Sequence, residues 1–282
     1  MEGSRWVHLL QLLGDDSPVV HGAVLGKLRE LGTDPLAALD AEGVEVNPRQ
    51  RQRLLSCRME LEEYWLSEGW NRWVSAPADL ESFHALISTL LSVYGGISDP
   101  RRLLDKWARD YSLHHPVPDL ETLVAFLFRE DGMQGDTEDY FAPRNSSLAW
   151  VLENRKGLPI TLCSALVLIA KRVGVEAHGV AFPGHFLASG EVQGRRVWID
   201  AFDGGRLIGR DELVEALGRV PEEMRRHVLS PASDEDICVR ILRNVATSLE
   251  KVEDVDRHRR AVEWLGALDG LRRGDKVPDP FS

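Results

Sequence analysis

The chain has 282 residues, of which 43% are hydrophobic and 28% charged, and its formal net charge is −11. This length is enough to bury a substantial core, and the composition is that of a globular protein, not of a collagen-like or disordered one. The acidic balance disfavours nucleic acid as a general partner, because a phosphate backbone attracts clustered Lys and Arg. We therefore expect a folded protein without general affinity for nucleic acid.

Targeting and cysteine patterns point to the cytoplasm. The most apolar stretch, residues 162–170, is too short for a bilayer span of about 18 residues, and the first residues lack the features of a secretory signal. Cys57, Cys163 and Cys238 are odd in number and far apart, which is typical of reduced thiols and not of a disulfide frame or zinc motif. We expect a cytoplasmic protein that contacts no membrane and holds no metal or other cofactor.

The first 47 residues predict a pair of helices. Apolar residues recur at helical spacing over 6–13 and again from Pro18 to about Leu31, with a turn between them. This unit resembles a single HEAT-type repeat, and we assign residues 1–47 to it. An amphipathic hairpin packed on the main body is the alternative, since repeats need neighbours to bury their faces.

Residues 48–130 predict further helices that pack on the core. The first is long and charged and runs over 48–75, with Trp65, Trp70 and Trp73 as its expected core anchors. Three more follow, each beginning at or near an Asp that caps the first-turn amides, over 79–94, 99–111 and 119–129. The acidic, glycine-containing segment 131–136 is typical of a turn-rich linker, and we place a domain boundary there.

The segment that follows changes in character. A short helix is predicted over 148–155, and Pro159 begins a second one that ends at Gly174. Because apolar residues surround this second helix, we expect it to be buried. Three short segments then have strand character and predict an antiparallel sheet behind the helix; they are residues 176–182, 185–189 and 195–200.

The chain ends in predicted helices. One covers about 211–217, and an amphipathic pair from Glu235 onward resembles a tetratricopeptide unit, with a plain helical cap as the alternative. We accordingly divide the second half into a core of residues 131–230 and a tail of residues 231–282. Repeat-like ends without neighbours also favour self-association.

A His and an Asp are candidates to act together in the predicted hairpin. If Gly190 pairs with Arg195, His185 lies opposite Asp200 on the same face, with Cβ atoms about 5 Å apart. A register shifted by one residue would send Asp200 to the other face. A carboxylate beside an imidazole raises the pKa of the His and orients its ring, which is the base half of a catalytic triad. The natural place for a nucleophile is the start of the buried helix, where the helix dipole favours a thiolate.

Several short motifs recur in an order that resembles a known family. They are Pro143-Arg144-Asn145-Ser146, Gly157-Leu158-Pro159, Pro183-Gly184-His185-Phe186, Trp198-Ile199-Asp200 and Gly204-Gly205-Arg206. The sequence resembles the transglutaminase-like superfamily and, more narrowly, its bacterial SirB-type branch, well over residues 145–210 and loosely outside them. The resemblance implies an α+β fold with a papain-like core, in which a central buried helix lies against a small antiparallel sheet. A mainly helical N-terminal region and a tetratricopeptide-like tail would flank that core.

The resemblance also implies a site built on a Cys-His-Asp triad. His185 takes the His position and Asp200 the Asp position, whereas the Cys position falls on Pro159, which has neither a nucleophile nor an amide proton. Cys163 would substitute if Thr161 caps the helix, because the thiol would then lie in the first turn. If Pro159 is the first helical residue, Cys163 lies about 6 Å further along the axis and is buried.

The leading hypothesis is a non-catalytic transglutaminase-like module, a pseudoenzyme, whose cleft binds a peptide or another protein. Beside His185 and Asp200, the expected binding residues are Asn145, Pro159, Asp203 and Arg206. The alternative is a cysteine hydrolase or acyltransferase with Cys163 as nucleophile, His185 as general base and Asp200 as its orienting partner. A third possibility is a purely architectural domain without a site.

Overall fold

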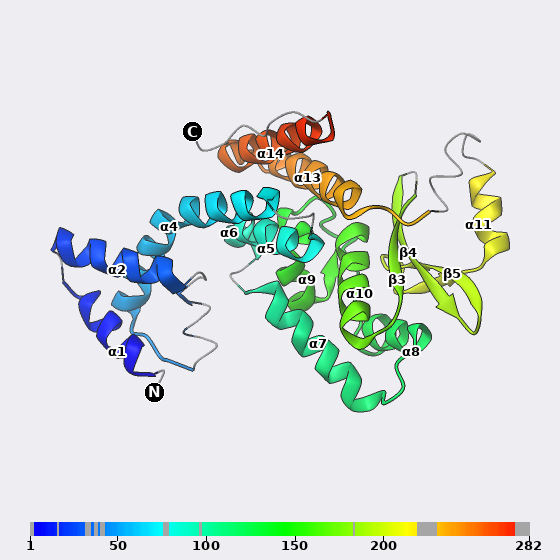
Figure 1. Cartoon of the computed structure of the whole chain (residues 1–282), viewed down its shortest axis with the longest axis horizontal. Helices are drawn as coiled ribbons and strands as arrows, with labels where there is room; N and C mark the ends of the chain where they lie inside the picture. Colours follow the sequence, from blue (N-terminus) through cyan, green and yellow to red (C-terminus); the bar gives the residue numbers. More distant parts are fainter. Residues whose placement is uncertain are drawn as a thin grey trace.

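The structure is a computed structural model that describes residues 3–15, 17–31, 35–36, 39, 43–75, 79–95, 98–182, 184–218 and 230–273. Figure 1 shows a helical extension at the N-terminal end, a group of helices around α10 in the middle, and a small sheet at the opposite end. The α+β class predicted from the sequence is therefore confirmed. Pro183, part of one of the sequence motifs, lies outside the described residues.

The N-terminal extension has an apolar core of its own. Helices α1 (Gly3–Leu12) and α2 (Pro18–Leu31) pack against the first half of α4 (Pro48–Ser75), and they bury Trp6, Leu28 and Leu54. The same long helix then continues into the main core. Because α4 takes part in both cores, it joins the extension to the rest of the chain.

The tryptophans of α4 follow this division. Trp70 and Trp73 are buried in the main core, as predicted, and Trp70 stacks on Trp264 of the tail with ring centroids 5.0 Å apart. Trp65 is only partly buried and packs against the extension's core. Aromatic stacking of this kind adds to the stabilisation from burial.

Asp residues begin the next helices, as predicted. Asp79, Asp99 and Asp119 accept hydrogen bonds from first-turn amides of the helices that follow them. These helices are α5 (Leu80–Leu90), α7 (Pro100–His114) and α8 (Leu120–Val124), with the short α6 (Ser92–Gly95) after α5. The sequence did not predict that α8 continues as a π-helix over Ala125–Glu130.

The segment predicted to be a linker holds a strand instead. Strand β1 (Gln134–Gly135) pairs in parallel with β2 (Lys156–Gly157), and the ring of Phe202 lies where a side chain at position 135 would project. A glycine is required there because any Cβ would clash with the ring. Between these strands, the 3₁₀-helix η2 (Pro143–Ser146) precedes α9 (Leu148–Asn154).

The central helix is α10 (Pro159–Val173), whose bounds are as predicted. It begins after Leu158 and ends at Gly174, which has φ 73° and adopts the left-handed conformation that closes many helices. Nearly all of its side chains are buried in the main core, as the apolar pattern predicted.

A four-stranded antiparallel sheet packs against α10. Its strands follow in the order β3 (Ala177–Phe182), β4 (His185–Val192), β5 (Arg195–Asp200) and β6 (Arg206–Ile208). Three of these were predicted, whereas β6 was not. Its three residues are too few to produce a clear alternation of polar and apolar side chains.

The predicted pairing of Gly190 with Arg195 is wrong. Val192 pairs with Arg195, because β4 runs three residues further than predicted and a two-residue turn, Gln193-Gly194, closes the hairpin. Both turn residues have positive φ, at 50° and 74°, as a type I′ turn requires. The register thus differs by two residues from the expected one, and a shift of two leaves every side chain on its predicted face.

The two faces of the sheet pack against different elements. Phe186, Ala188 and Ile199 belong to the main core with α10, whereas Leu187 and Trp198 alternate with them and pack against α11 (Arg210–Leu217). We call the face that carries Phe186, Ala188 and Ile199 the inner face, and the face that carries Leu187 and Trp198 the outer face. Among the described residues, the helix that covers the outer face is α11.

The tail consists of α13 (Asp234–Lys251) and α14 (Val255–Arg273), which lie together along one side of the molecule (Figure 1). Arg257 of α14 donates to the Leu90 carbonyl of α5 and to Glu62 of α4, and Tyr94 donates to Asp254. The tail is therefore bonded to the helices before the core. No helix in the described ranges is both long enough and apolar enough to cross a membrane.

Candidate functional site

The structure brings His185 and Asp200 into contact. The Nε2 atom of His185 lies 2.9 Å from Oδ2 of Asp200. His185 is the first residue of β4 and Asp200 the last of β5, so they meet diagonally across the hairpin. Long side chains reach such diagonal neighbours on one face of a sheet. The sequence thus predicted the pair, although the register that produces it is not the expected one.

Asp200 is held as a carboxylate. Its other oxygen, Oδ1, accepts hydrogen bonds from the amides of Phe202 and Asp203, each at 3.1 Å. Burial by itself raises the pKa of this carboxyl, but the hydrogen bond and charge of His185, with these two amides, outweigh burial and lower the pKa. Asp200 is therefore ionised near neutral pH and orients the imidazole.

The pair borders a cavity of about 250 Å³ on the outer face of the sheet. Apolar side chains form much of its wall, with polar groups between them. The lining residues are Phe182, Gly184, His185, Leu187, Asp200, Arg206, Ile208, Glu212, Leu213 and Ala216. We call this space the histidine pocket. An apolar wall with a few convergent polar groups is typical of a ligand site.

Arg206 and Asp203, two of the expected binding residues, lie near its rim. Arg206 donates through Nε to Asp203 at 2.9 Å and through a terminal nitrogen to Glu212. Its side chain is about half exposed, so the guanidinium still faces solvent while two carboxylates hold it. Of these residues, Arg206 and Glu212 line the pocket directly.

The start of α10 is closed to solvent. Leu158 precedes the helix and Pro159 is its first residue, so the alternative in which Thr161 caps the helix is wrong. Cys163 is fully buried one turn in, and its sulfur lies 3.7 Å from the Phe186 carbonyl oxygen. Burial and, secondarily, the charge of Asp200 raise the pKa of this thiol far above its ordinary value.

Cys163 and the imidazole lie on different sides of the sheet. Phe186, whose carbonyl contacts the thiol, belongs to the inner face, whereas the residues around the histidine pocket belong to the outer face. Among the described residues, no hydrogen bond joins Cys163 to His185. The structure therefore brings His185 and Asp200 into contact, but Cys163 is not part of that group.

Asn145 and Pro159 occupy buried positions away from the pocket. The side-chain amide of Asn145 donates to the Asp139 carbonyl at 2.7 Å, and the backbone carbonyl of Asn145 accepts from the Leu158 amide at 3.2 Å. Asn145 thus connects η2 to the residue before α10. Neither Asn145 nor Pro159 lines the histidine pocket.

Arg240 is a residue that the sequence analysis missed. From α13 it donates to the His185 carbonyl at 2.8 Å and to the Phe182 carbonyl at 3.4 Å, and its guanidinium lies over the Phe186 ring. It therefore bonds both ends of the turn that precedes His185. No local pattern identifies it, because its partners lie 55 and 58 positions earlier in the chain.

An exposed aromatic group adjoins His185. The Phe202 ring meets the imidazole edge to face at 6.4 Å and the Tyr140 ring at 5.8 Å, and Tyr140 in turn contacts Phe141. Tyr140 and Phe141 are 41% and 47% exposed, so aromatic side chains reach solvent beside the site. Exposed aromatic side chains of this kind are enriched at binding surfaces.

The fold agrees with a family comparison. Residues 100–243, just over half of the chain, match the model of the transglutaminase-like superfamily. The chain belongs to the transglutaminase-like superfamily. The matched residues include α10, the whole sheet and Arg240.

Curated relatives match part of the chain. A UPF0162 protein of Xylella fastidiosa is 37% identical over 146 residues, which cover 50% of this chain and 52% of the relative. A UPF0162 protein of Vibrio cholerae is 35% identical over 85 residues, covering 30% and 32%. F-box only protein 21 of Pongo abelii is 29% identical over 109 residues, covering 36% of this chain and 17% of that protein.

The match therefore spans about half the length of the first of these relatives and less of the others. No solved structure matches the chain.

Proposed function

We propose that this protein is a non-catalytic member of the transglutaminase-like superfamily, of its SirB-type branch, and binds a peptide segment of a partner protein in the histidine pocket. The observation that carries the proposal is the closed start of α10. Pro159 stands at the expected nucleophile position, and Cys163 is fully buried with a raised pKa. A thiol that stays protonated and inaccessible does not attack a substrate.

The pocket has features that suit a peptide. Its volume of about 250 Å³ accommodates one or two side chains, and its apolar wall would bury them. The ionised Asp200 orients His185, whose other ring nitrogen has no hydrogen-bond partner within the described protein. That nitrogen and Arg206 would bond to the peptide's polar groups, while Tyr140 and Phe141 would extend the contact surface.

The rest of the chain would support this role. We propose a HEAT-like hairpin over residues 1–47, a helical region over 48–130, the core over 131–230 and a tetratricopeptide-like tail over 231–282. Helical pairs of these types present surfaces to partner proteins or to a second copy. We further propose that the protein acts in the bacterial cytoplasm.

A cysteine hydrolase or acyltransferase remains the competing function. The observation in its favour is the His–Asp pair, which is already formed at 2.9 Å. It would need Cys163 to leave the core and reach the imidazole, because the thiol is fully buried.

Alkylation distinguishes the two functions. The native protein is treated with iodoacetamide near pH 7, and modification of Cys163 is followed by mass spectrometry. We expect no modification of Cys163 until urea unfolds the protein, with Cys163→Ala as the control for assignment. Modification of the native protein at the rate of a free thiol, abolished in His185→Ala, would instead establish an activated nucleophile.

Binding is tested with a displayed library of random peptides. We expect selected peptides to bind the wild type and to lose at least tenfold in affinity with His185→Ala. The matched control is His178→Ala, because His178 is a partly exposed residue of β3 that pairs with Glu176 and does not line the pocket. Equal affinity of both variants for the selected peptides would place the peptide site elsewhere.

A further inference from the structure

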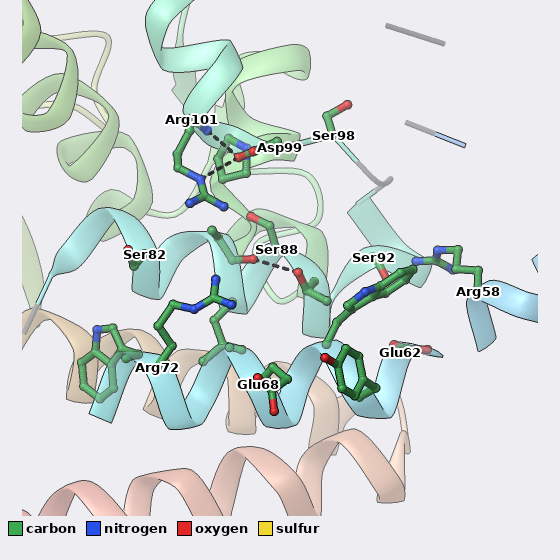
Figure 2. Close-up of a pocket in the computed structure, with 18 of the residues that line it drawn as sticks. Arg58, Glu62, Glu68, Arg72, Ser82, Ser88, Ser92, Ser98, Asp99 and Arg101 are labelled. Atoms are coloured by element: carbon green, nitrogen blue, oxygen red, sulfur yellow. Dashed lines mark hydrogen bonds and ion pairs between the residues drawn. The ribbon is translucent and has the colours of Figure 1, made fainter. Parts of the chain in front are cut away.

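A second and larger cavity lies between α4 and α5, near the start of α7 (Figure 2). Its volume is about 380 Å³, within the range of small-molecule sites. Almost all of its lining residues precede residue 100, so it lies largely outside the part of the chain that matches the superfamily. The pocket proposed for peptide binding shares no residue with it. We call it the arginine cavity.

Most acidic groups that line this cavity already have partners. Glu62 forms an ion pair with Arg257 at 3.0 Å. Asp99 accepts from the Arg101 amide and from its Nε atom, at 3.0 and 3.2 Å. Asp79 accepts from two amides at the start of α5, and these bonds with the Ser82 hydroxyl lower its pKa although burial alone would raise it. These carboxylates are therefore engaged at helix ends or with other cations.

Two arginines, in contrast, converge on the cavity. Figure 2 shows the side chains of Arg72 on α4 and Arg101 on α7 both directed toward α5, and both residues line the cavity. Over the described ranges, no carboxylate lies within ion-pair distance of Arg72, and Arg101 engages Asp99 through Nε alone. Glu68 also borders the cavity but pairs with neither of them. Two cations that line one cavity repel each other, and an anion bound between them would offset that repulsion.

Buried polar groups without partners mark the other end of the cavity. The hydroxyl of Ser92, a residue only 7% exposed, has no hydrogen bond, and neither has the indole Nε1 of Trp65. Buried donors without partners are uncommon, because each costs about 1–3 kcal/mol. Both residues line the cavity, so a small movement of either side chain would bring its donor to an acceptor on a bound molecule. This observation is independent of the arginines.

We propose that the arginine cavity binds a small organic anion. A carboxylate or phosphate group would lie between Arg72 and Arg101, where planar guanidinium groups bond such oxygens in pairs. The body of the molecule would follow the groove between α4 and α5, and a second acceptor would reach Ser92 and Trp65.

The proposal is tested by titration of the full chain at constant ionic strength, adjusted with chloride. The probes are inorganic phosphate, succinate and butyrate, and the readouts are calorimetry and the fluorescence of Trp65 and Trp73 in the cavity wall. We expect saturable binding of phosphate or succinate, and the preferred one of the two identifies the anionic group. Butyrate, which has the length of succinate but a single carboxylate, should bind at least tenfold more weakly than succinate.

Variants then assign the site. Arg72→Gln and Arg101→Gln should each weaken binding by about tenfold or more, since each removes a charge-assisted hydrogen bond. Ser92→Ala should weaken succinate more than phosphate, because only the longer probe reaches it. The matched control is Arg102→Gln, an exposed α7 residue that does not line the cavity.

Arg72→Lys keeps the charge but not the paired geometry, and it guards against a folding defect in the glutamine variants. We expect binding intermediate between wild type and Arg72→Gln, with an unchanged midpoint of thermal unfolding. Absence of saturable binding of both phosphate and succinate to the wild type would overturn the proposal. So would equal binding by wild type and Arg72→Gln.

Discussion

The two faces of the four-stranded sheet differ in what they hold. The inner face, against α10, is closed: Phe186, Ala188 and Ile199 are buried there, and Cys163 is sealed beneath the Phe186 carbonyl. The outer face carries the His185–Asp200 pair beside a cavity that opens to solvent. The His185–Asp200 pair is therefore accessible, whereas the start of α10, where the nucleophile was expected, is buried in the core. The predictions below test that contrast.

Opening the inner face should have the largest effect. Phe186→Ala removes a large buried ring from the main core, and we expect it to lower the free energy of unfolding by about 3–5 kcal/mol. Urea unfolding measures this change. Phe141→Ala is the matched control, because that ring is 47% exposed and its loss should cost less than about 1 kcal/mol. Similar losses in the two variants would contradict the assignment of a closed inner face.

The closed interior should also show itself in the pH dependence of stability. His84 on α5 is fully buried, neither ring nitrogen has a partner, and burial lowers its pKa to about 3. The unfolded state, with a His pKa of about 6.5, therefore binds a proton that the folded state does not. The stability of the fold with a neutral, buried His84 is therefore fully present above pH 6.5. Below that value, the free energy of unfolding falls by about 1.4 kcal/mol per pH unit, down to the folded-state pKa of about 3.

The variant His84→Leu removes this titration. We expect urea unfolding at pH 7, 6, 5 and 4.5 to show a steeper loss of stability for the wild type than for the variant. His115→Leu is the control, since His115 lies in the loop after α7 and is only partly buried. Parallel pH profiles for wild type and His84→Leu would mean that His84 is not in a closed environment.

The turn that precedes His185 depends on Arg240. Arg240→Gln removes charge-assisted bonds to the His185 and Phe182 carbonyls, and we expect a loss of about 1–3 kcal/mol in unfolding free energy. Peptides selected against the wild type should also bind more weakly, because the imidazole is positioned less well. Arg243→Gln, on the exposed side of α13, should leave both quantities unchanged. If a folded Arg240→Gln variant binds peptide with unaltered affinity, the bonds of Arg240 do not position His185 for binding.

The smallest effect on stability is expected at the rim of the outer face. Arg206→Gln breaks ion pairs with Asp203 and Glu212, but the side chain is about half exposed. Exposed pairs contribute about 0–1 kcal/mol, so the unfolding free energy should change by no more than that. Peptide affinity should nevertheless fall. A variant that loses stability while binding peptide normally would make Arg206 a structural residue only.

Local signals in the chain predicted several elements accurately. Pro159 begins α10 because its fixed φ suits the first turn of a helix. Gly174 ends α10 because it adopts positive φ. Asp79, Asp99 and Asp119 cap their helices through amides two or three residues away. The apolar ring around α10 predicted its burial, and the hairpin placed His185 and Asp200 on one face. All of these depend on residues close together in sequence.

Other features were decided only when distant elements packed together. The hairpin register depends on a turn at Gln193, a residue type that gives no strong turn signal, so the length of β4 was not predictable. Arg240 reaches the turn before His185 from a helix more than 50 residues away, and the arginine cavity needs α4, α5 and α7 to converge. Periodicity and capping act over a few residues, whereas a site depends on which side chains the packing of whole elements brings within hydrogen-bonding distance. For that reason the sequence predicted the His–Asp pair, and the tertiary structure decided that Cys163 lies on the other side of the sheet.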